Sequence, residues 1–380
     1  MQLPELSVYV HIPWCVRKCP YCDFNSHAPK AALPEQAYVE ALIKDLNADA
    51  HWAQGRKVST IFIGGGTPSL FKASSIAQII NAIDAAIGLE SNCEITMEAN
   101  PGTVEHEAFS AYRQAGVNRL SLGIQTFADE QLTILGRIHN SANAKSAAKQ
   151  AMAAGFDSVN LDLMHGLPQQ TPEQAMADIE IAASLNPTHL SWYQLTIEPN
   201  TLFHSRPPQL PQDEALWTIF DQGTQRMNQL GFRQYEVSAW AQDGYQCRHN
   251  LNYWRFGDYL GIGCGAHGKI TFPEQNRIVR AEKIKHPKGY MEAIDVRRQL
   301  VDIEPQERPL EYLMNRARLH QAIPKSEFQR FTGLRPLDLT HKLQPAIERN
   351  LVIDTDNDWQ LTEKGQLFVN DVLELLVPED

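Results

Sequence analysis

Two hydrophobic patterns alternate through the first half of the chain. Short runs of β-branched and other apolar residues recur at regular intervals, and the stretches between them place apolar residues three or four positions apart. The short runs predict strands at residues 6–12, 59–63, 94–98, 119–124, 158–163 and 189–195. The longer stretches, such as residues 35–53 and 75–87, predict amphipathic helices. Six strand–helix units in series predict a parallel sheet, because parallel neighbours need a crossover connection.

The expected fold is α/β: a partial (β/α)6 TIM-like barrel. Several predicted strands are apolar on both faces, as when helices cover one face and a barrel interior lies on the other. A doubly wound open sheet is the alternative, and hydrophobic periodicity does not separate the two. The barrel is favoured because a polar or Gly-rich cluster follows each strand, at the end where barrel enzymes build their sites. These clusters are residues 11–15, 64–68, 98–101, 125–127, 162–166 and 196–199.

After about residue 200 the repeat stops. A Pro-rich connection leads to an expected helix near 213–230, a strand near 234–239 and a Gly- and aromatic-rich stretch through Gly268. From Pro309 onward we expect mainly helices with a two-stranded element near 351–361, like a small winged-helix module. The predicted organisation is a barrel over 1–205, a barrel extension and connecting region over 206–300, and a C-terminal helical domain over 301–380.

The net charge of the chain argues against two classes of binding partner. The formal net charge is −11, and no Lys/Arg-rich run suggests nucleic acid or an anionic membrane surface as a partner. The first fifteen residues lack the pattern of an export signal, and no segment approaches the roughly 20 consecutive apolar residues that cross a bilayer. We expect a cytoplasmic protein without an integral membrane segment, in which the six cysteines stay reduced.

Three of those cysteines, Cys15, Cys19 and Cys22, lie within eight residues. Soft thiolates select iron–sulfur clusters, zinc or copper(I). Three ligands leave one iron of a four-iron cluster without a cysteine, and an open metal position is a place for chemistry. The alternative is a zinc-stabilised interaction module with His11 or His27 as fourth ligand, although zinc cysteines usually come as CxxC pairs from two segments.

The cysteine motif resembles that of the radical S-adenosylmethionine superfamily: CxxxCxxC follows the first barrel strand, and Tyr21 precedes the last cysteine. In that superfamily the open iron is chelated by the amino and carboxylate groups of S-adenosylmethionine. Reductive cleavage of the cofactor then gives methionine and a 5′-deoxyadenosyl radical. The resemblance implies a 4Fe–4S cluster on Cys15, Cys19 and Cys22, with S-adenosylmethionine as a second cofactor.

The other strand-end clusters supply candidate cofactor contacts. Glycines let the backbone at 64–66 approach a ligand closely, so we expect the N–H groups there to meet a carboxylate or amine. Glu98 can accept hydrogen bonds from ribose hydroxyls. The plainer alternatives are a strand-to-helix turn, a solvated acid, a surface ion pair for Arg137 and a packed strand residue for Tyr9. With the resemblance, the expected cofactor-binding residues are Tyr9, Tyr21, Gly65, Gly66, Thr67, Glu98, Gln125, Arg137 and Asp162.

Within the superfamily, a series of blocks resembles the oxygen-independent coproporphyrinogen III oxidase group, and most of all its HemW-type haem chaperones. The blocks are HIPWCVRKCPYCDFNS, IFIGGGTPS, MEANPGT, NRLSLGIQTF, NLDLMHGLP, LSWYQLTIEPNT, HNLNYWRFGDYLGIGCGAHG and the C-terminal module. Two features depart from the oxidase: Phe24 stands where the oxidase has a further cysteine, and only fourteen residues precede Cys15, where the oxidase has a long extension.

The resemblance therefore implies a chaperone that binds haem and passes it to acceptor haemoproteins, with respiratory ones as candidates. Oxidative decarboxylation of coproporphyrinogen III is the alternative. No catalytic residue is assigned, and enzymatic turnover and self-association into a homodimer are left open.

The segment 249–254 is the expected haem contact. The imidazole of His249 can ligate iron, and the ring of Tyr253 can stack on a porphyrin. The alternative for His249 is a hydrogen bond to the neighbouring backbone. Further candidates are Cys247, Cys264 and His267, whereas Cys93 is expected in the core.

Overall fold

One large sheet organises the molecule. The computed structural model describes residues 1–29, 32–103 and 108–378, and within them twelve strands form a sheet of order β12-β11-β10-β9-β1-β2-β3-β4-β5-β6-β8-β7. Its centre comprises β1 (Leu6–Ile12), β2 (Val58–Gly65), β3 (Leu89–Ala99), β4 (Arg119–Gln125), β5 (Ser158–His165) and β6 (His189–Gln194). These six are parallel neighbours in chain order. A doubly wound sheet would reverse its order in the middle, so the partial barrel is confirmed.

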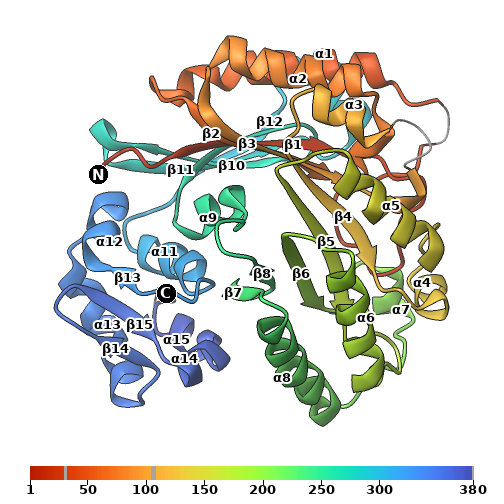
Figure 1. The fold of residues 1–380 in the computed structure, drawn as a ribbon. Helices are drawn as coiled ribbons and strands as arrows, with labels where there is room; N and C mark the ends of the chain where they lie inside the picture. The colour runs from red at the N-terminus through yellow and green to blue at the C-terminus, as the bar shows by residue number, and fades with distance from the viewer. Residues whose placement is uncertain (30–31, 104–107, 379–380) are drawn as a thin grey trace.

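Helices between these strands cover the outer face of the sheet (Figure 1). They are α1 (Glu35–Asp49), α2 (Ala73–Ala86), α3 (Phe109–Gln114), α4 (Asp129–Ile134), α5 (Ser141–Ala153) and α6 (Pro172–Ser184). In α2 the isoleucines at 76, 79, 80 and 83 are buried, which is the spacing that places apolar residues on one helix face. Both α5 and α6 begin with a capping box, formed by Asn140 and Thr171.

Further strands extend the barrel at both edges. Beside β1 lies β9 (Asp258–Ile262), which is parallel to it, followed by the antiparallel β10 (His267–Phe272), β11 (Arg277–Lys283) and β12 (Arg297–Asp302). Beside β6 lie β8 (Ala239–Ala241) and β7 (Arg233–Glu236), a hairpin where we expected a single strand. The connecting helices are α7 (Leu202–Ser205), α8 (Asp213–Gln229), α9 (Arg248–Trp254) and α10 (Pro287–Glu292). Sequence periodicity missed β9 and β10 because a glycine interrupts the apolar pattern of each, and it missed β11 and β12 because charged residues make up half or more of each strand.

The C-terminal segment is mainly helical, as expected. It contains α11 (Arg308–Arg316), α12 (Lys325–Thr332), α13 (Pro336–Glu348), α14 (Glu363–Leu367) and α15 (Val369–Glu374). The sheet in it has three strands rather than two, because β13 (Ile323–Pro324) joins β15 (Asp358–Leu361) and β14 (Val352–Asp354).

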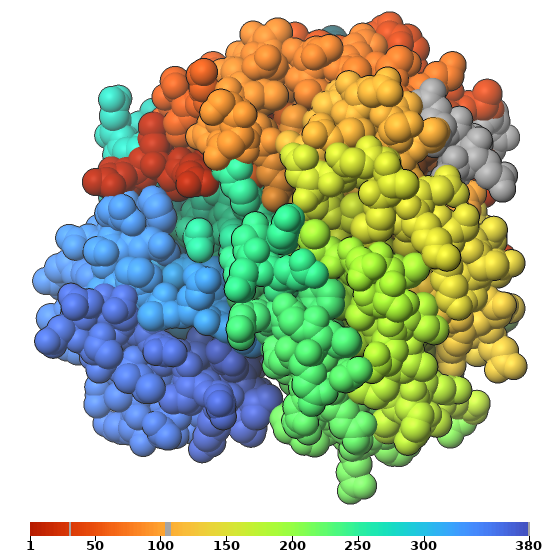
Figure 2. Space-filling model, viewed as in Figure 1, coloured from red at the N-terminus to blue at the C-terminus, as the bar shows by residue number. Residues whose placement is uncertain are grey.

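This segment has its own core, which also takes in Phe256 and Ile278 from the barrel extension. On the face in Figure 2 it lies beside the surface formed by residues of the barrel extension. None of the described helices is long and apolar enough to cross a bilayer.

Candidate functional site

Two cavities adjoin one another at the carboxyl ends of β1, β2 and β3. The first, which we call the cysteine cavity, has a volume of about 460 Å3 and contains Cys15, Cys19 and Cys22 in its wall. The second, which we call the cationic cavity, has a volume of about 700 Å3 and lies between β1, α9, β10 and β11. Five residues line both cavities: Asp23, Phe24, Ser26, Gly65 and Glu98. A ligand in one cavity is therefore adjacent to a ligand in the other.

The cysteine cavity gathers residues from every strand end of the central barrel. Besides the three cysteines it is lined by Tyr21, Gly65, Gly66, Thr67, Glu98, Gln125, Arg137 and Asp162. Of the expected cofactor residues, Tyr9 alone lies elsewhere, in the wall of the cationic cavity. The parallel strands bring these residues together because all their carboxyl ends meet at one rim.

The three cysteines line one cavity. Among the described residues, no group of three or more His, Cys, Asp or Glu side chains converges closely enough to hold one ion. Of the two histidines considered as a fourth zinc ligand, His11 has a partner at both ring nitrogens, Tyr9 Oη and the carbonyl of Asn25, each at 2.9 Å, and His27 has one at Nε2, 3.2 Å from Asn25 Oδ1. Thiols spread around a common cavity fit an iron–sulfur cluster, which is a larger body than one zinc ion.

The glycine motif has a different role from the one we expected. Gly65 N donates to Glu98 Oε2 at 3.0 Å, and the N–H groups of Gly66 and Thr67 donate to the carbonyls of Ile12 and Trp14, each at 2.7 Å. The prediction that these N–H groups meet a ligand is wrong, because neighbouring protein atoms already bind them. They hold the β1 end and the start of the cysteine loop in place.

Position 65 has no room for a side chain, because the imidazole of His11 lies against it. Its φ is +114°, and a Cβ there would lie 2.5 Å from the imidazole of His11. The ring of His11 therefore occupies the space that a side chain at position 65 would take.

Two carboxylic acids face the cysteine cavity. Burial and, to a smaller extent, the charge of Asp162 together raise the pKa of Glu98 to about 8. Burial also raises the pKa of Asp162, which accepts hydrogen bonds from Ser121 Oγ at 2.8 Å and Asn160 Nδ2 at 2.7 Å. Desolvated carboxylates of this kind gain from a ligand that offers hydroxyl or amino groups.

Arg137 and Gln125 are held as parts of the site. Arg137 Nη1 lies 3.6 Å from Cys19 Sγ, and Nη2 donates to the carbonyl of Gly123 at 2.8 Å. The surface ion-pair alternative for Arg137 is therefore wrong. Gln125 has a left-handed backbone, with φ +70°, and its Oε1 accepts a hydrogen bond from Tyr193 at 2.9 Å. Sequence reasoning missed Tyr193, although its place at the end of a predicted strand was a usable signal.

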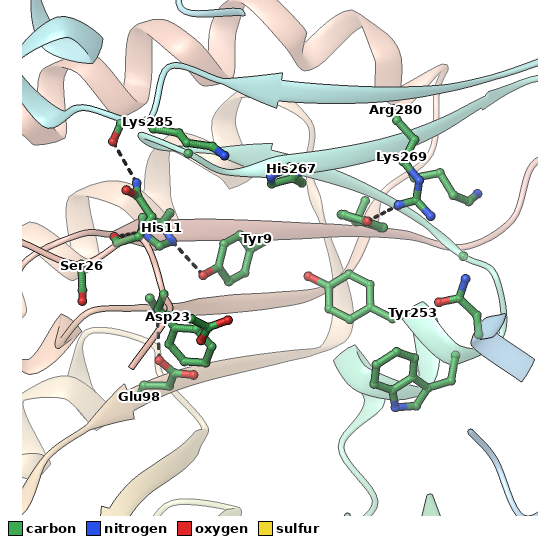
Figure 3. A pocket seen from close by; sticks show the side chains of 18 of the residues that line it. Tyr9, His11, Asp23, Ser26, Glu98, Tyr253, His267, Lys269, Arg280 and Lys285 are labelled. Carbon is green, nitrogen blue, oxygen red and sulfur yellow. Dashed lines mark hydrogen bonds between the residues drawn. The ribbon is translucent and has the colours of Figure 1, made fainter. Parts of the chain in front are cut away.

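In the cationic cavity, basic and aromatic side chains face one another (Figure 3). His267, Lys269, Arg280 and Lys285 come from β10, β11 and the residues after β11, and the ring of Tyr9 lies opposite on β1. Tyr253, Trp254 and Tyr259 complete the aromatic part of the wall. The sequence offered no local signal for the basic side chains, because they come together only through pairing of the extension strands.

The basic groups of this cavity have protein partners. Lys269 Nζ lies 2.9 Å from Asp258 Oδ1, and Lys285 Nζ lies 3.1 Å from Glu282 Oε1. Arg280 donates to Tyr259 at 2.9 Å and pairs with Glu311.

The buried His249 is hydrogen-bonded to Tyr253, which lines the cationic cavity. His249 Nδ1 lies 2.8 Å from Thr60 Oγ1 and Nε2 lies 2.8 Å from the hydroxyl of Tyr253. Burial lowers the pKa of His249 to about 3, and its side chain lines neither cavity. The structure therefore places His249 behind Tyr253, whose ring it orients in the cavity wall.

The remaining cysteines also lie outside the cavities. Cys247 Sγ contacts Glu94 Oε1 at 3.6 Å, and Cys264 Sγ lies 3.8 Å from Asn25 Nδ2. Neither lines a cavity, and Cys93 is buried in the main core.

Comparison with known proteins gives the family. The family model of the Radical SAM superfamily matches residues 9–182, and that of the HemN C-terminal domain matches residues 303–368. The Heme chaperone HemW of Haemophilus influenzae and that of Escherichia coli are each 55% identical to this chain, over the full length of both proteins. HemW of Bacillus subtilis is 33% identical, with 96% of this chain and 97% of that protein covered.

Among solved structures, coproporphyrinogen III oxidase (HemN) of Escherichia coli has a TM-score of 0.83 at 23% identity, and the match covers 98% of this chain and 90% of that one. This likeness shows a common fold over almost the whole chain. The family matches, the full-length relatives and the shared fold agree, and the chain belongs to the HemW family of HemN-like radical SAM proteins.

Proposed function

We propose that this protein is a haem chaperone, which binds haem in the cationic cavity and delivers it to acceptor haemoproteins. The observation that carries the proposal is a 700 Å3 cavity that combines aromatic walls with basic side chains and adjoins the cysteine cavity. The name of the full-length relatives supports it. Respiratory haemoproteins in the cytoplasm or at its membrane are the first acceptors to test.

Haem chemistry fits this lining. A porphyrin offers a large flat apolar surface and carries two carboxylates on one edge. Tyr253, Trp254 and Tyr259 provide ring surfaces for the plane, and Lys285 and Arg280 provide positive charge for the carboxylates. Lys269, Lys285 and Arg280 are paired with protein carboxylates, so an anionic ligand would bind here by taking over one of these contacts.

The cysteine cavity would hold the two cofactors that the family implies. We assign the 4Fe–4S cluster to Cys15, Cys19 and Cys22, with Arg137 beside Cys19 balancing negative charge. We assign S-adenosylmethionine to the remaining wall, where Glu98, Gln125 and Asp162 present hydrogen-bonding groups. When bound, the cluster supplies an electron and an open iron. The protein positions the ligands.

The test uses full-length protein reconstituted anaerobically with iron and sulfide. Titration with haem is expected to shift the Soret band to saturation, and addition of an apo-haemoprotein is expected to draw the haem away. Lys285→Glu should weaken haem binding by about tenfold, or about 1.4 kcal/mol, because it reverses a charge at the cavity wall. Lys288→Glu, on the exposed side of α10, is the matched control and should bind like the original protein. Absence of saturable haem binding would exclude the proposal.

Oxidative decarboxylation of a porphyrinogen is the second candidate. One observation favours it: Gly65 and Glu98 line both cavities, so a molecule in the cationic cavity adjoins the S-adenosylmethionine site. Incubation of the reduced, reconstituted protein with coproporphyrinogen III should then release methionine and 5′-deoxyadenosine in proportion to protoporphyrinogen IX. If none of the three products forms while haem binding persists, the chaperone function stands alone.

A further inference from the structure

Resting on the proposed function, we propose that His267 is the protein ligand of the haem iron. His267 is the first residue of β10 and lines the cationic cavity. Three observations carry the assignment: its ring nitrogens are available, its backbone is fixed, and its position is central among the groups that suit a porphyrin.

Availability distinguishes His267 from the other histidines of the cavity wall, His11 and His27. His11 is engaged at both nitrogens, with Tyr9 Oη at 2.9 Å and the carbonyl of Asn25 at 2.9 Å. His27 is engaged at Nε2. The nearest described partner of His267 is Glu282 Oε1, 3.9 Å from Nε2, which exceeds hydrogen-bond distance. Its lone pair can therefore bind a metal without breaking a protein contact.

The backbone at His267 is fixed by glycines in a stretch of the sequence that the cofactor site does not use. A Cβ on Gly261 in β9 would lie 1.9 Å from the carbonyl oxygen of His267, and one on Gly268 would lie 3.1 Å from the carbonyl oxygen of Tyr259. These glycines let β9 and β10 approach closely at the cavity wall. A ligand residue on a rigid strand holds its metal with less loss of entropy than one on a loop.

The position of His267 matches the layout of a metalloporphyrin. In Figure 3 it lies between Lys285 on one side and Lys269 and Arg280 on the other. Tyr9 and Tyr253 lie across the cavity from it. Iron is at the centre of the ring and the carboxylates at its edge, so a central imidazole flanked by cations presents the required groups in the required order.

The protonation state also suits ligation. Partial burial lowers the pKa of His267, and Lys285, Arg280 and Arg298 lower it further, while Glu282 opposes the shift. A neutral imidazole is the form that binds iron. On binding, one ring nitrogen donates its lone pair to ferric iron and a water molecule leaves the iron, so no proton, electron or further reactant is needed.

His249 is the alternative ligand, and its surroundings argue against it. Both of its nitrogens are engaged, and the ring of Tyr253 stands between it and the cavity. Ligation by His249 would require both hydrogen bonds to break and a fully buried side chain to move.

The test compares His267→Gly, His249→Gln and the exposed His51→Ala in full-length, anaerobically prepared protein titrated with haem. We expect His267→Gly to lose the imidazole-ligated spectrum and to bind haem at least about tenfold more weakly. Free imidazole should restore the spectrum in His267→Gly, which also shows that the variant is folded. His51→Ala should leave the spectrum unchanged, and His249→Gln should keep imidazole ligation.

The outcomes distinguish the assignment of the iron ligand from the proposed chaperone function. If the original protein binds haem and His267→Gly gives the same spectrum and affinity, the ligand assignment is overturned while the chaperone function stands. Loss of the imidazole spectrum in His249→Gln alone would assign the iron to His249. If the original protein binds no haem, both proposals fail.

Discussion

At the scale of single residues, Glu98 connects the two cavities and has a strongly perturbed acidity. Its carboxylate lines both cavities and accepts one hydrogen bond, from Gly65 N. Burial raises its pKa to about 8, so in the protein without cofactors much of it is protonated at neutral pH. A ligand that brings an amino group would restore the charged form.

The raised pKa predicts a pH-dependent stability for the protein without cofactors. Between the unfolded value near 4.5 and the folded value near 8, the folded state holds a proton that the unfolded state has lost. Stability therefore falls as pH rises through this window and levels off above it. Glu98→Gln removes this titration. The melting temperature of the variant minus that of the original protein should therefore be several degrees larger at pH 8 than at pH 6. An equal gain at both pH values would contradict the assignment.

Gly65 supports a second prediction at this scale. In Gly65→Ala the new methyl group meets the imidazole of His11, and the φ of +114° is unfavourable for any side chain. We expect a loss of about 2 kcal/mol or more in the free energy of unfolding, with impaired cluster reconstitution, measured by urea denaturation and iron content. Gly289→Ala is the control: it lies within α10 where a Cβ meets only Ile284 at 3.5 Å, so its stability should stay the same or rise.

At the scale of elements, α9 depends on a strand far from it in sequence. Glu94 of β3 accepts hydrogen bonds from the N–H groups of Arg248 at 3.1 Å and His249 at 3.0 Å. Glu94→Ala leaves these N–H groups without a partner and should cost about 1–3 kcal/mol of stability. Because α9 carries Tyr253, haem affinity should fall as well.

The control for this prediction is Glu90→Ala. Glu90 faces Arg248 at 4.0 Å, and both side chains are substantially exposed, so the pair contributes little. Chemical denaturation and haem titration of both variants test the role of α9. Equal behaviour of the two variants would show that Glu94 does not hold the helix.

At the scale of the whole molecule, the C-terminal segment supports the wall of the cationic cavity. The guanidinium of Arg318 lies 4.3 Å from the ring centre of Trp254, and its Nη2 lies 3.4 Å from the buried carboxylate of Glu236 on β7. Asn315 of α11 also lines the cavity. The C-terminal segment therefore contributes to the proposed haem site and packs against the barrel extension.

Arg318→Met tests this contact, because methionine keeps much of the length and loses the charge. We expect about 1 kcal/mol or more of destabilisation and weaker haem binding, since Glu236 loses its cation and Trp254 loses its stacked partner. Arg233→Met is the matched control, because the Arg233–Asp243 pair is almost fully exposed. Urea midpoints and Soret titrations that do not differ between the two variants would rule out the support role.

The barrel and the residues of the cysteine cavity could be predicted from local sequence. Residues 6–12 form β1 as expected, because apolar residues at every second position, at Leu6, Val8, Val10 and Ile12, are typical of a strand. Cys15, Glu98 and Asp162 each follow or end such a strand, and parallel strands bring their carboxyl ends to one rim. Neighbouring strands in this part of the fold are also neighbours in sequence, so the local hydrophobic periodicity was enough to predict most of the strand order.

Only the tertiary structure decided the cationic cavity. His267 and Lys285 meet Tyr9 because β9 pairs with β1 across about 250 residues, and no periodicity near any of them indicates that pairing. The structure also decided that the N–H groups of Gly66 and Thr67 hold the cysteine loop, and that His249 lies behind Tyr253. Residue chemistry and strand order are local properties of the chain, whereas the availability of a donor or a lone pair depends on which atoms the fold places around it.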